Sequence, residues 1–285
     1  MRKYIAIAIL LITHLSYNTK AQSFYSGEEY GVALGGAQYF GDLNENYGFK
    51  YVRPAFGVFT RFHMNPFIAV RLGAAYTKVG YDDKFSSNIY NKTRNLNFRS
   101  DIVEAAVQAE FNFFRFFTGN EKGRFTPYLT GGVGIFYYNP YTIYQGRRQY
   151  LRPLGTEGQN VGLGKTYNKL SMCFPVGAGI KYWIKPGVNL GFEIANRLTL
   201  TDYMDDVSTT YAGAQNFESD PAYPSPAFAL QDRSLEVSNV PLGRQGKQRG
   251  NSASKDQYMT FMVTLSFQLK VYKCPSYIKE NYYMY

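Results

Sequence analysis

Three aspartates that crowd one short stretch are the first candidates for chemistry. Asp202, Asp205 and Asp206 supply carboxylate oxygens, the ligand type that hard cations such as Ca²⁺ prefer. They lack the alternating spacing of an EF-hand loop, so we predict a turn whose side chains face solvent, and we predict no metal. We predict no cofactor either, because the glycine-rich run 131–134 lies inside a predicted strand and not in a phosphate-binding loop.

A histidine is the next candidate, for catalysis. The sequence has two histidines, and only His63 remains if an N-terminal leader ending at Ala21 is removed. The strand pattern described below predicts a membrane barrel. A barrel that modifies lipids of the outer leaflet needs a base and a nucleophile near its outer rim. His63 instead falls at the end of a predicted strand, beside a tight turn at Asn65 and Pro66. We therefore predict that the protein is not an enzyme.

Charged residues at alternate strand positions form a third group. Seven of them fall on the polar face of predicted strands: Arg61, Arg71, Glu104, Glu110, Lys181, Glu193 and Arg197. Buried charges of both signs are expected to pair, because removing one alone from water is costly. We predict a paired network inside the fold that fixes its shape, in preference to a path for protons or ions.

The elements that must position these residues show a period of two, which is typical of strands and not of helices. Eight segments alternate in this way: 30–40, 54–64, 67–79, 98–114, 125–138, 170–184, 187–201 and 257–272. Each is 11 residues or longer. Strands of soluble sandwiches are usually about 5–6 residues, whereas membrane-crossing strands need about 9–11. The length therefore favours a membrane barrel over a sandwich.

The connections between these segments alternate strictly between long and short. They are long at 41–53, 80–97, 139–169 and 202–256, and short at 65–66, 115–124 and 185–186. Outer-membrane barrels have long extracellular loops and short periplasmic turns. We predict an all-β fold, an eight-stranded antiparallel transmembrane β-barrel with four long extracellular loops. Side chains fill the interior of a barrel of this size, so we expect no passive conduction.

The N-terminus predicts export. Arg2 and Lys3 precede an apolar stretch at 5–12, and small or polar residues follow up to Ala21. These are the three regions of a secretory signal peptide, which we place at 1–21. No Pro-rich or Ser-rich linker divides the rest, so we predict one domain, 22–285, that ends in a periplasmic tail at 273–285. The predicted location is the cell outer membrane, with the barrel crossing it several times.

Composition and charge narrow the class of partner. The chain has 27 Tyr, 22 Phe and 27 Gly, and its formal net charge is +10. The cations are spread out and the chain is predicted to be exported, so we exclude nucleic acid. Outer-membrane lipid and lipopolysaccharide are the expected counter-charges. Two basic loop sets could meet lipopolysaccharide phosphates or could simply be solvated: Arg147, Arg148 and Arg152, and Arg244, Lys247 and Arg249.

Several stretches resemble a family of outer-membrane barrels of the Bacteroidetes, similar to the PorG component of the type IX secretion system. The stretches are Gly35–Asn44, Pro127–Leu129, Gly134–Phe136, Leu154–Gln159, Phe174–Tyr182 and Thr201–Tyr211. The last of them contains Asp202, Tyr203, Asp205 and Asp206 as a family-motif loop. The resemblance implies a barrel that anchors a periplasmic ring, built with a lipoprotein, to the outer membrane for protein secretion and gliding motility.

Two functional hypotheses remain open at this point. A scaffold of the secretion machine would act through a periplasmic face formed by Asn65, Pro66, Lys185, Pro186 and Lys273. A self-contained surface barrel, similar to OmpA and OmpX, would act through its loops in adhesion or envelope integrity. The short turns and the long loops lie at opposite ends of the predicted barrel, so the two hypotheses place the working surface on opposite sides of the membrane.

Overall fold

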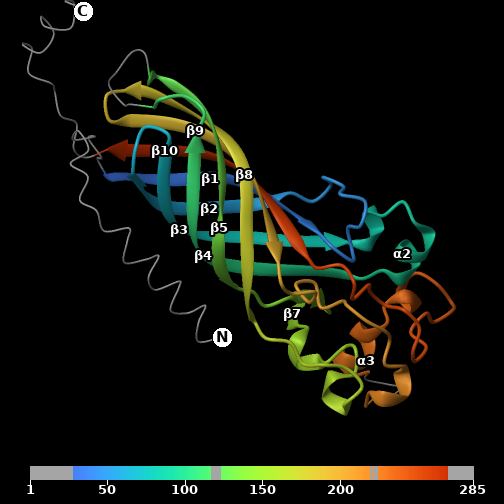
Figure 1. The fold of residues 1–285 in the computed structure, drawn as a ribbon. Coiled ribbons are helices and arrows are strands. Elements are labelled where there is room, and N and C mark those ends of the chain that lie inside the picture. Colours follow the sequence, from blue (N-terminus) through green and yellow to red (C-terminus); the bar gives the residue numbers. More distant parts are fainter. Residues whose placement is uncertain (1–27, 117–122, 219, 221–223, 269–285) are drawn as a thin grey trace, which may run out of the picture. The chain divides into compact units, whose positions relative to one another are not determined.

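The computed structural model describes residues 28–116, 123–218, 220 and 224–268 (Figure 1). The predicted signal peptide and the predicted periplasmic tail lie outside the described residues. Within the described part of the chain, no helix is long and apolar enough to cross a membrane. Strands dominate, and the predicted all-β fold class is confirmed.

Eight long strands form the body of the fold. They are β1 (Glu28–Phe40), β2 (Arg53–His63), β3 (Ile68–Asp82), β4 (Asn97–Asn112), β5 (Phe125–Tyr137), β8 (Leu170–Lys185), β9 (Val188–Thr199) and β10 (Gln257–Gln268). Each overlaps one of the eight predicted segments. The largest difference inside the described residues is at β3, which continues three residues beyond the predicted end.

These strands close into an antiparallel eight-stranded barrel. Neighbours follow the order β3-β2-β1-β10-β9-β8-β5-β4, and a further pairing of β3 with β4 joins the two ends of this series. The first and last of the described strands meet at the β1–β10 seam, where Gly35 pairs with Met262. A side chain at Gly35 would place its Cβ 1.8 Å from the Phe261 carbonyl oxygen, so glycine is needed for this close approach.

Alternation along each strand decides what points outward and what points inward. In β9, Phe192 is 41% exposed whereas its neighbour Glu193 is 3% exposed. The same reversal of the soluble pattern recurs in β10, where Val263 is exposed and Thr264 is buried. The barrel therefore has an apolar outer wall and a polar interior. This is the arrangement of barrels that cross membranes.

Two ends of the barrel differ in their connections. The turns 64–67 and 186–187 lie at one end, which we call the turn end, together with the described residues 113–116 and 123–124. Loop 1 (41–52), loop 2 (83–96), loop 3 (138–169) and the described residues of loop 4 (200–218, 220 and 224–256) lie at the other, the loop end. The four loops pack together there, and Leu43, Tyr138, Met204 and Leu230 belong to the buried apolar core that continues from the barrel into them.

The loops contain secondary structure that the sequence pattern did not predict. Loop 3 holds a hairpin of β6 (Tyr141–Tyr144) and β7 (Arg147–Tyr150), whose turn residues Gln145 and Gly146 both have positive φ. This is the backbone that two-residue hairpin turns require. Short helices complete the loops: α2 (Ile89–Arg94), α3 (Pro226–Gln231), and 3₁₀ turns η1 (Asp83–Phe85), η3 (Arg152–Leu154), η4 (Gln159–Val161), η5 (Ala214–Asn216) and η6 (Ser234–Glu236).

Candidate functional site: a paired barrel interior and a clasp of buried loop charges

All seven charged residues predicted for the interior point into the barrel. Each of them is at most 7% exposed: Arg61, Arg71, Glu104, Glu110, Lys181, Glu193 and Arg197. An eighth charge, Glu29, joins them and is fully buried. Glu29 was not among the predicted interior residues, because the first strand was predicted to begin at residue 30. With Glu29 included, four carboxylates balance four cations, and we call these eight residues the interior network.

Glu110 is the centre of the interior network. Its Oε2 lies 2.8 Å from Arg61 Nε and its Oε1 lies 3.3 Å from Arg71 Nε, while Lys181 donates to the same carboxylate. Arg71 also donates to Glu193, Nη1 to Oε2, at 2.7 Å. One buried carboxylate is thus shared by three cations that come from β2, β3 and β8. The network ties strands together across the lumen, as well as along the sheet.

The remaining pairs of the interior network lie on either side of this centre. Arg197 Nε is 3.2 Å from Glu104 Oε2 on the side nearer the loops. Glu29 contacts Arg61 near the turn end, and His63 Nε2 lies 2.8 Å from its other oxygen. The side chains leave a hollow of only about 50 Å³ between Arg71, Glu104, Glu193 and Arg197. A barrel of eight strands encloses a space just wide enough for side chains to fill.

His63 lies in an arrangement that does not support acyl-transfer chemistry. It ends β2 at the turn end, where sequence analysis placed it. Both His63 and Ser266 contact the carboxylate of Glu29, whereas a serine nucleophile would have to contact the histidine that activates it. All three side chains are buried. Their geometry is that of a structural pairing with Arg61.

The aspartates of the family-motif loop are buried, which corrects the prediction that they face solvent. Asp202, Asp205 and Asp206 are 5%, 1% and 0% exposed. Folding of loop 4 against the other loops removes them from water, and hydroxyl and backbone N–H groups replace the water. Ser208 donates to Asp202, while Thr156 and Tyr167 both donate to Asp206. Tyr203, the fourth motif residue, stacks on Tyr167 with ring centroids 4.6 Å apart.

Two buried arginines fasten the loops to one another. Arg249 of loop 4 donates to Glu157 of loop 3, Nη1 to Oε1, at 3.2 Å. Arg94 of loop 2 donates to Asp83 and also to backbone carbonyls of Asp42 in loop 1 and Arg249 in loop 4. Arg249 was predicted either to meet a lipopolysaccharide phosphate or to be solvated, and its burial contradicts both, because the residue is 3% exposed.

A tyrosine holds both ends of loop 4 against β1. The Tyr39 hydroxyl lies 2.7 Å from Asp205 Oδ2 and 2.7 Å from Asp256 Oδ1. A phenol has one proton to donate, so at least one of the two carboxyls must carry a proton of its own for both contacts to be hydrogen bonds. Burial raises the pKa of Asp205 and of Asp256 well above the usual range. Nearby carboxylates add to this effect, and the hydrogen bond from Tyr39 opposes it in both residues.

Other carboxyls of the loops are shifted in the same direction. Burial raises the pKa of Asp42 to about 7, opposed by a hydrogen bond from the Asn251 N–H. Burial also raises the pKa of Asp202 and of Asp206 to about 6. We call the set that joins the loops the loop clasp: Tyr39, Asp42, Arg94, Glu157, Asp205, Asp206, Arg249 and Asp256. Among the described residues, no group of three or more His, Cys, Asp or Glu side chains is arranged to hold a metal ion.

The turn end carries the residues predicted to form a partner face. Lys185 and Pro186 are exposed, and Asn65 and Pro66 are half-buried. Asn65 has a local role, because its Oδ1 accepts hydrogen bonds from the N–H groups of Phe67 and Ile68 and so closes the turn. Lys273, the last residue of the predicted face, lies outside the described residues.

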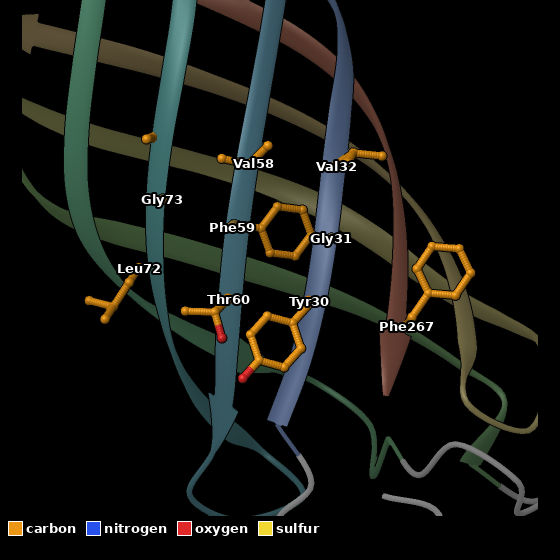
Figure 2. A pocket seen from close by; sticks show the side chains of 10 residues that line it. Tyr30, Gly31, Val32, Val58, Phe59, Thr60, Leu72, Gly73 and Phe267 are labelled. Atoms are coloured by element: carbon orange, nitrogen blue, oxygen red, sulfur yellow. The ribbon is translucent and has the colours of Figure 1, made fainter. Parts of the chain in front are cut away.

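A hollow of about 570 Å³ marks the outer wall near the turn end (Figure 2). Its lining comes from β1, β2, β3 and β10 and is almost entirely apolar: Tyr30, Gly31, Val32, Val58, Phe59, Thr60, Leu72, Gly73, Ala74 and Phe267. It opens on the same face as the exposed apolar side chains. Its chemistry matches the rest of this wall, and no charged side chain lines it.

Comparisons with known proteins give one family model and several similar solved structures. A search of the curated proteins finds no match. Similar solved structures include Neisserial surface protein A, with 9% identity, a TM-score of 0.43, and coverage of 86% of this chain and 98% of that one. Ail of Yersinia pestis has 9% identity, a TM-score of 0.41, and coverage of 86% and 100%. The N-terminal barrel of Pseudomonas aeruginosa OprF has 8% identity, a TM-score of 0.35, and coverage of 85% and 100%.

A family model covers the greater part of the chain. The model is described as "Domain of unknown function (DUF6089)" and it matches residues 2–219. The match takes in β1 to β9, loops 1 to 3, and Asp205 and Asp206 of the loop clasp, whereas Arg249 and Asp256 lie beyond it. The chain therefore belongs to the DUF6089 family.

Proposed function

We propose that this protein is an outer-membrane barrel that works by contact and not by conduction or catalysis. The observation that carries this proposal is the interior network, in which four carboxylates and four cations pair inside the barrel. The apolar outer wall supports placement in a membrane, since a wall of exposed Leu, Val and Phe is poorly suited to water. By the usual sidedness of such barrels, the turn end faces the periplasm.

We further propose that the contact is with the type IX secretion and gliding machinery. The resemblance of the chain to the PorG-like barrels supports this role, in which the barrel anchors a periplasmic ring that includes a lipoprotein. The turn end is the surface such a ring would reach, and Lys185 and Pro186 are exposed there. The partners of this barrel would therefore bind at the β8–β9 turn.

Gene deletion tests the proposed role. Loss of the protein is expected to block export of type IX substrates, and surface gliding where the organism glides, while uptake of small dyes through the outer membrane stays nearly unchanged. Purification of the tagged barrel in mild detergent, followed by mass spectrometry, is expected to recover large periplasmic proteins. Normal export in the deletion strain would reject the secretion role.

A second candidate function is contact at the cell surface, and the loop clasp favours it. Buried pairs such as Arg249–Glu157 give the loops a fixed shape, which a binding surface needs and a mere connection does not. In this alternative the barrel would act in adhesion or envelope integrity through the loop end.

Matched charge reversals separate the two candidates. Lys185→Glu changes the turn end, and Lys165→Glu makes the same change at an exposed position of loop 3. The secretion proposal expects export to fall in the Lys185 variant alone, with both barrels assembled to the wild-type level. A defect confined to the Lys165 variant would favour the surface role.

A further inference from the structure

Charges on the outer wall of the barrel are few and are concentrated at one place. Among the described residues, the outward positions of the strands carry Glu28 and Lys185 at the turn end, and Lys78, Arg99, Asp101 and Asp82 at the loop ends of β3 and β4. Asp82 is paired with Lys84 at 2.9 Å. The rest of the wall is apolar or uncharged, so this cluster needs its own explanation.

The register brings the members of the cluster together. Lys78 lies directly opposite Asp101, and Gly80 lies opposite Arg99. Burial alternates on both strands: Val79 and Ser100 are 1% exposed and face inward, so Lys78, Arg99 and Asp101 face outward. Cross-strand neighbours on one face of a sheet have Cβ atoms roughly 5 Å apart. Two cations and one carboxylate therefore share a small patch.

The hairpin of loop 3 adds a third cation to this patch. Its residue Tyr141 pairs with Arg99 of β4, which joins the hairpin to the barrel wall. Arg148 of β7 lies over the Tyr141 ring, with Cζ 4.1 Å from the ring centroid, and its Nη1 is 3.7 Å from Asp101 Oδ2. The Arg148 side chain remains 48% exposed.

Asp101 does not neutralise the patch. Its Oδ1 accepts a hydrogen bond of 2.9 Å from the Tyr76 hydroxyl, and its Oδ2 faces Arg148. Within the residues that the structure describes, Lys78 and Arg99 have no ion pair of their own. Three cations against one carboxylate leave a net positive patch whose guanidinium groups suit the geometry of a phosphate.

Two exposed tyrosines flank the patch. Tyr76 and Tyr150, both 41% exposed, flank it on the outward side, and tyrosines of this kind mark the membrane–water interface of barrels. Below it the wall continues with the exposed apolar residue Val103, next to which acyl chains can lie.

We propose that Lys78, Arg99 and Arg148 bind the phosphate of an outer-leaflet lipid, with Tyr76 and Asp101 positioning Arg148. We call this the headgroup site. The inference rests on the proposed outer-membrane location, and it goes beyond that proposal by naming a lipid ligand. A phosphate attached to acyl chains would contact both the cations of the patch and the apolar wall below them, which a free phosphate or an acidic peptide would not.

Native mass spectrometry of the full-length barrel in detergent tests the headgroup site. The probes are diphosphorylated lipid A and the same lipid with its phosphates removed. The test variant replaces all three cations: Lys78→Gln, Arg99→Gln and Arg148→Gln. The matched control removes three exposed lysines from the loops: Lys92→Gln, Lys165→Gln and Lys255→Gln. Retention of the phosphorylated lipid is expected to fall about fivefold for each headgroup-site charge removed.

The outcomes are distinct. Support consists of strong retention of phosphorylated lipid by the wild type and by the control, weak retention by the test variant, and little retention of the dephosphorylated lipid by any of them. Equal retention by the test variant and the control would overturn the site. Complete displacement of the lipid by inorganic phosphate, at matched ionic strength, or by an acidic peptide would assign the patch to that ligand and overturn the lipid.

The proposed location and the headgroup site can be rejected by different experiments. Cell fractionation that finds the barrel outside the outer membrane would reject the proposed function, whatever the purified barrel binds. A change in gel mobility on heating shows that each variant is folded, so loss of lipid cannot be confused with loss of the barrel.

Discussion

Arg249 and Glu157 form a salt bridge in which neither side chain reaches water. Arg249 Nη1 lies 3.2 Å from Glu157 Oε1, and the two side chains are 2% and 0% exposed. Arg249 also donates to the Asp206 carbonyl at 2.6 Å, while Glu157 accepts from the backbone N–H groups of Ser208 and Thr209. Because these residues belong to loops 3 and 4, the two loops fold as a single unit.

Replacing Arg249 by Met is expected to open the loops without unfolding the barrel. Glu157 would be left buried without its cation, and removing one partner of a buried pair costs about 3–5 kcal/mol. Limited proteolysis should cut loop 4 faster, while the heat-dependent gel mobility of the barrel stays unchanged. Lys84→Met is the control, because Lys84 is 63% exposed in its pair with Asp82 and should matter little. Equal cutting of both variants would show that the Arg249 pair does not hold the loops.

Tyr39→Phe is expected to loosen both ends of loop 4. The variant removes one hydroxyl that contacts Asp205 and Asp256, and an unsatisfied buried group costs about 1–3 kcal/mol. Hydrogen exchange of the N–H groups of Met204 and Val207, which donate to these two carboxyls, should become faster. Tyr90→Phe removes an exposed hydroxyl bond to the Gln248 carbonyl and should leave this exchange unchanged. No difference between the two variants would argue against the clasp.

The loop clasp is expected to be more stable at about pH 4 than at about pH 7. Folding raises the pKa of Asp42 from 3.8 to about 7 and the pKa of Asp206 from 3.8 to about 6. Between the unfolded and the folded pKa values, the folded loops therefore bind more protons than the unfolded loops. Stability then falls as the pH rises from about 4 to about 7. Protease resistance of loop 4 should decrease over this range, measured with a protease whose activity is corrected at each pH. A clasp that weakens toward acid would contradict the sign of these shifts.

Glu110→Gln is expected to destabilise the barrel itself. Three cations, Arg61, Arg71 and Lys181, would lose a shared carboxylate, and breaking such a buried group costs about 3 kcal/mol or more. The urea concentration that unfolds the barrel in lipid vesicles should fall. Glu28→Gln serves as the control, because Glu28 is an exposed glutamate at the end of β1. Similar midpoints for the two variants would mean that the interior network adds little to stability.

The period of two explains why the barrel could be predicted and the loops could not. The apolar neighbours of a residue such as Glu193 predict which face of the sheet its side chain occupies, because successive strand residues point to opposite faces. Glu29 escaped because strand ends have no apolar neighbour on both sides. The loop clasp joins Tyr39 to Asp256, 217 positions away, and no local pattern records such a contact. No local sequence pattern distinguishes a buried arginine such as Arg249 from a solvated one, so only the fold shows that it is buried.

The β1–β10 seam sets a condition on how the protein is made. Every other barrel pairing joins strands that follow one another in the chain, but this one joins the first and last of the described strands. Until β10 has been synthesised, β1 and β9 each present a row of unpaired backbone N–H and C=O groups, which lipid cannot solvate. A chain interrupted inside loop 4 therefore has no stable form in the bilayer. Premature termination should therefore not yield a shortened barrel.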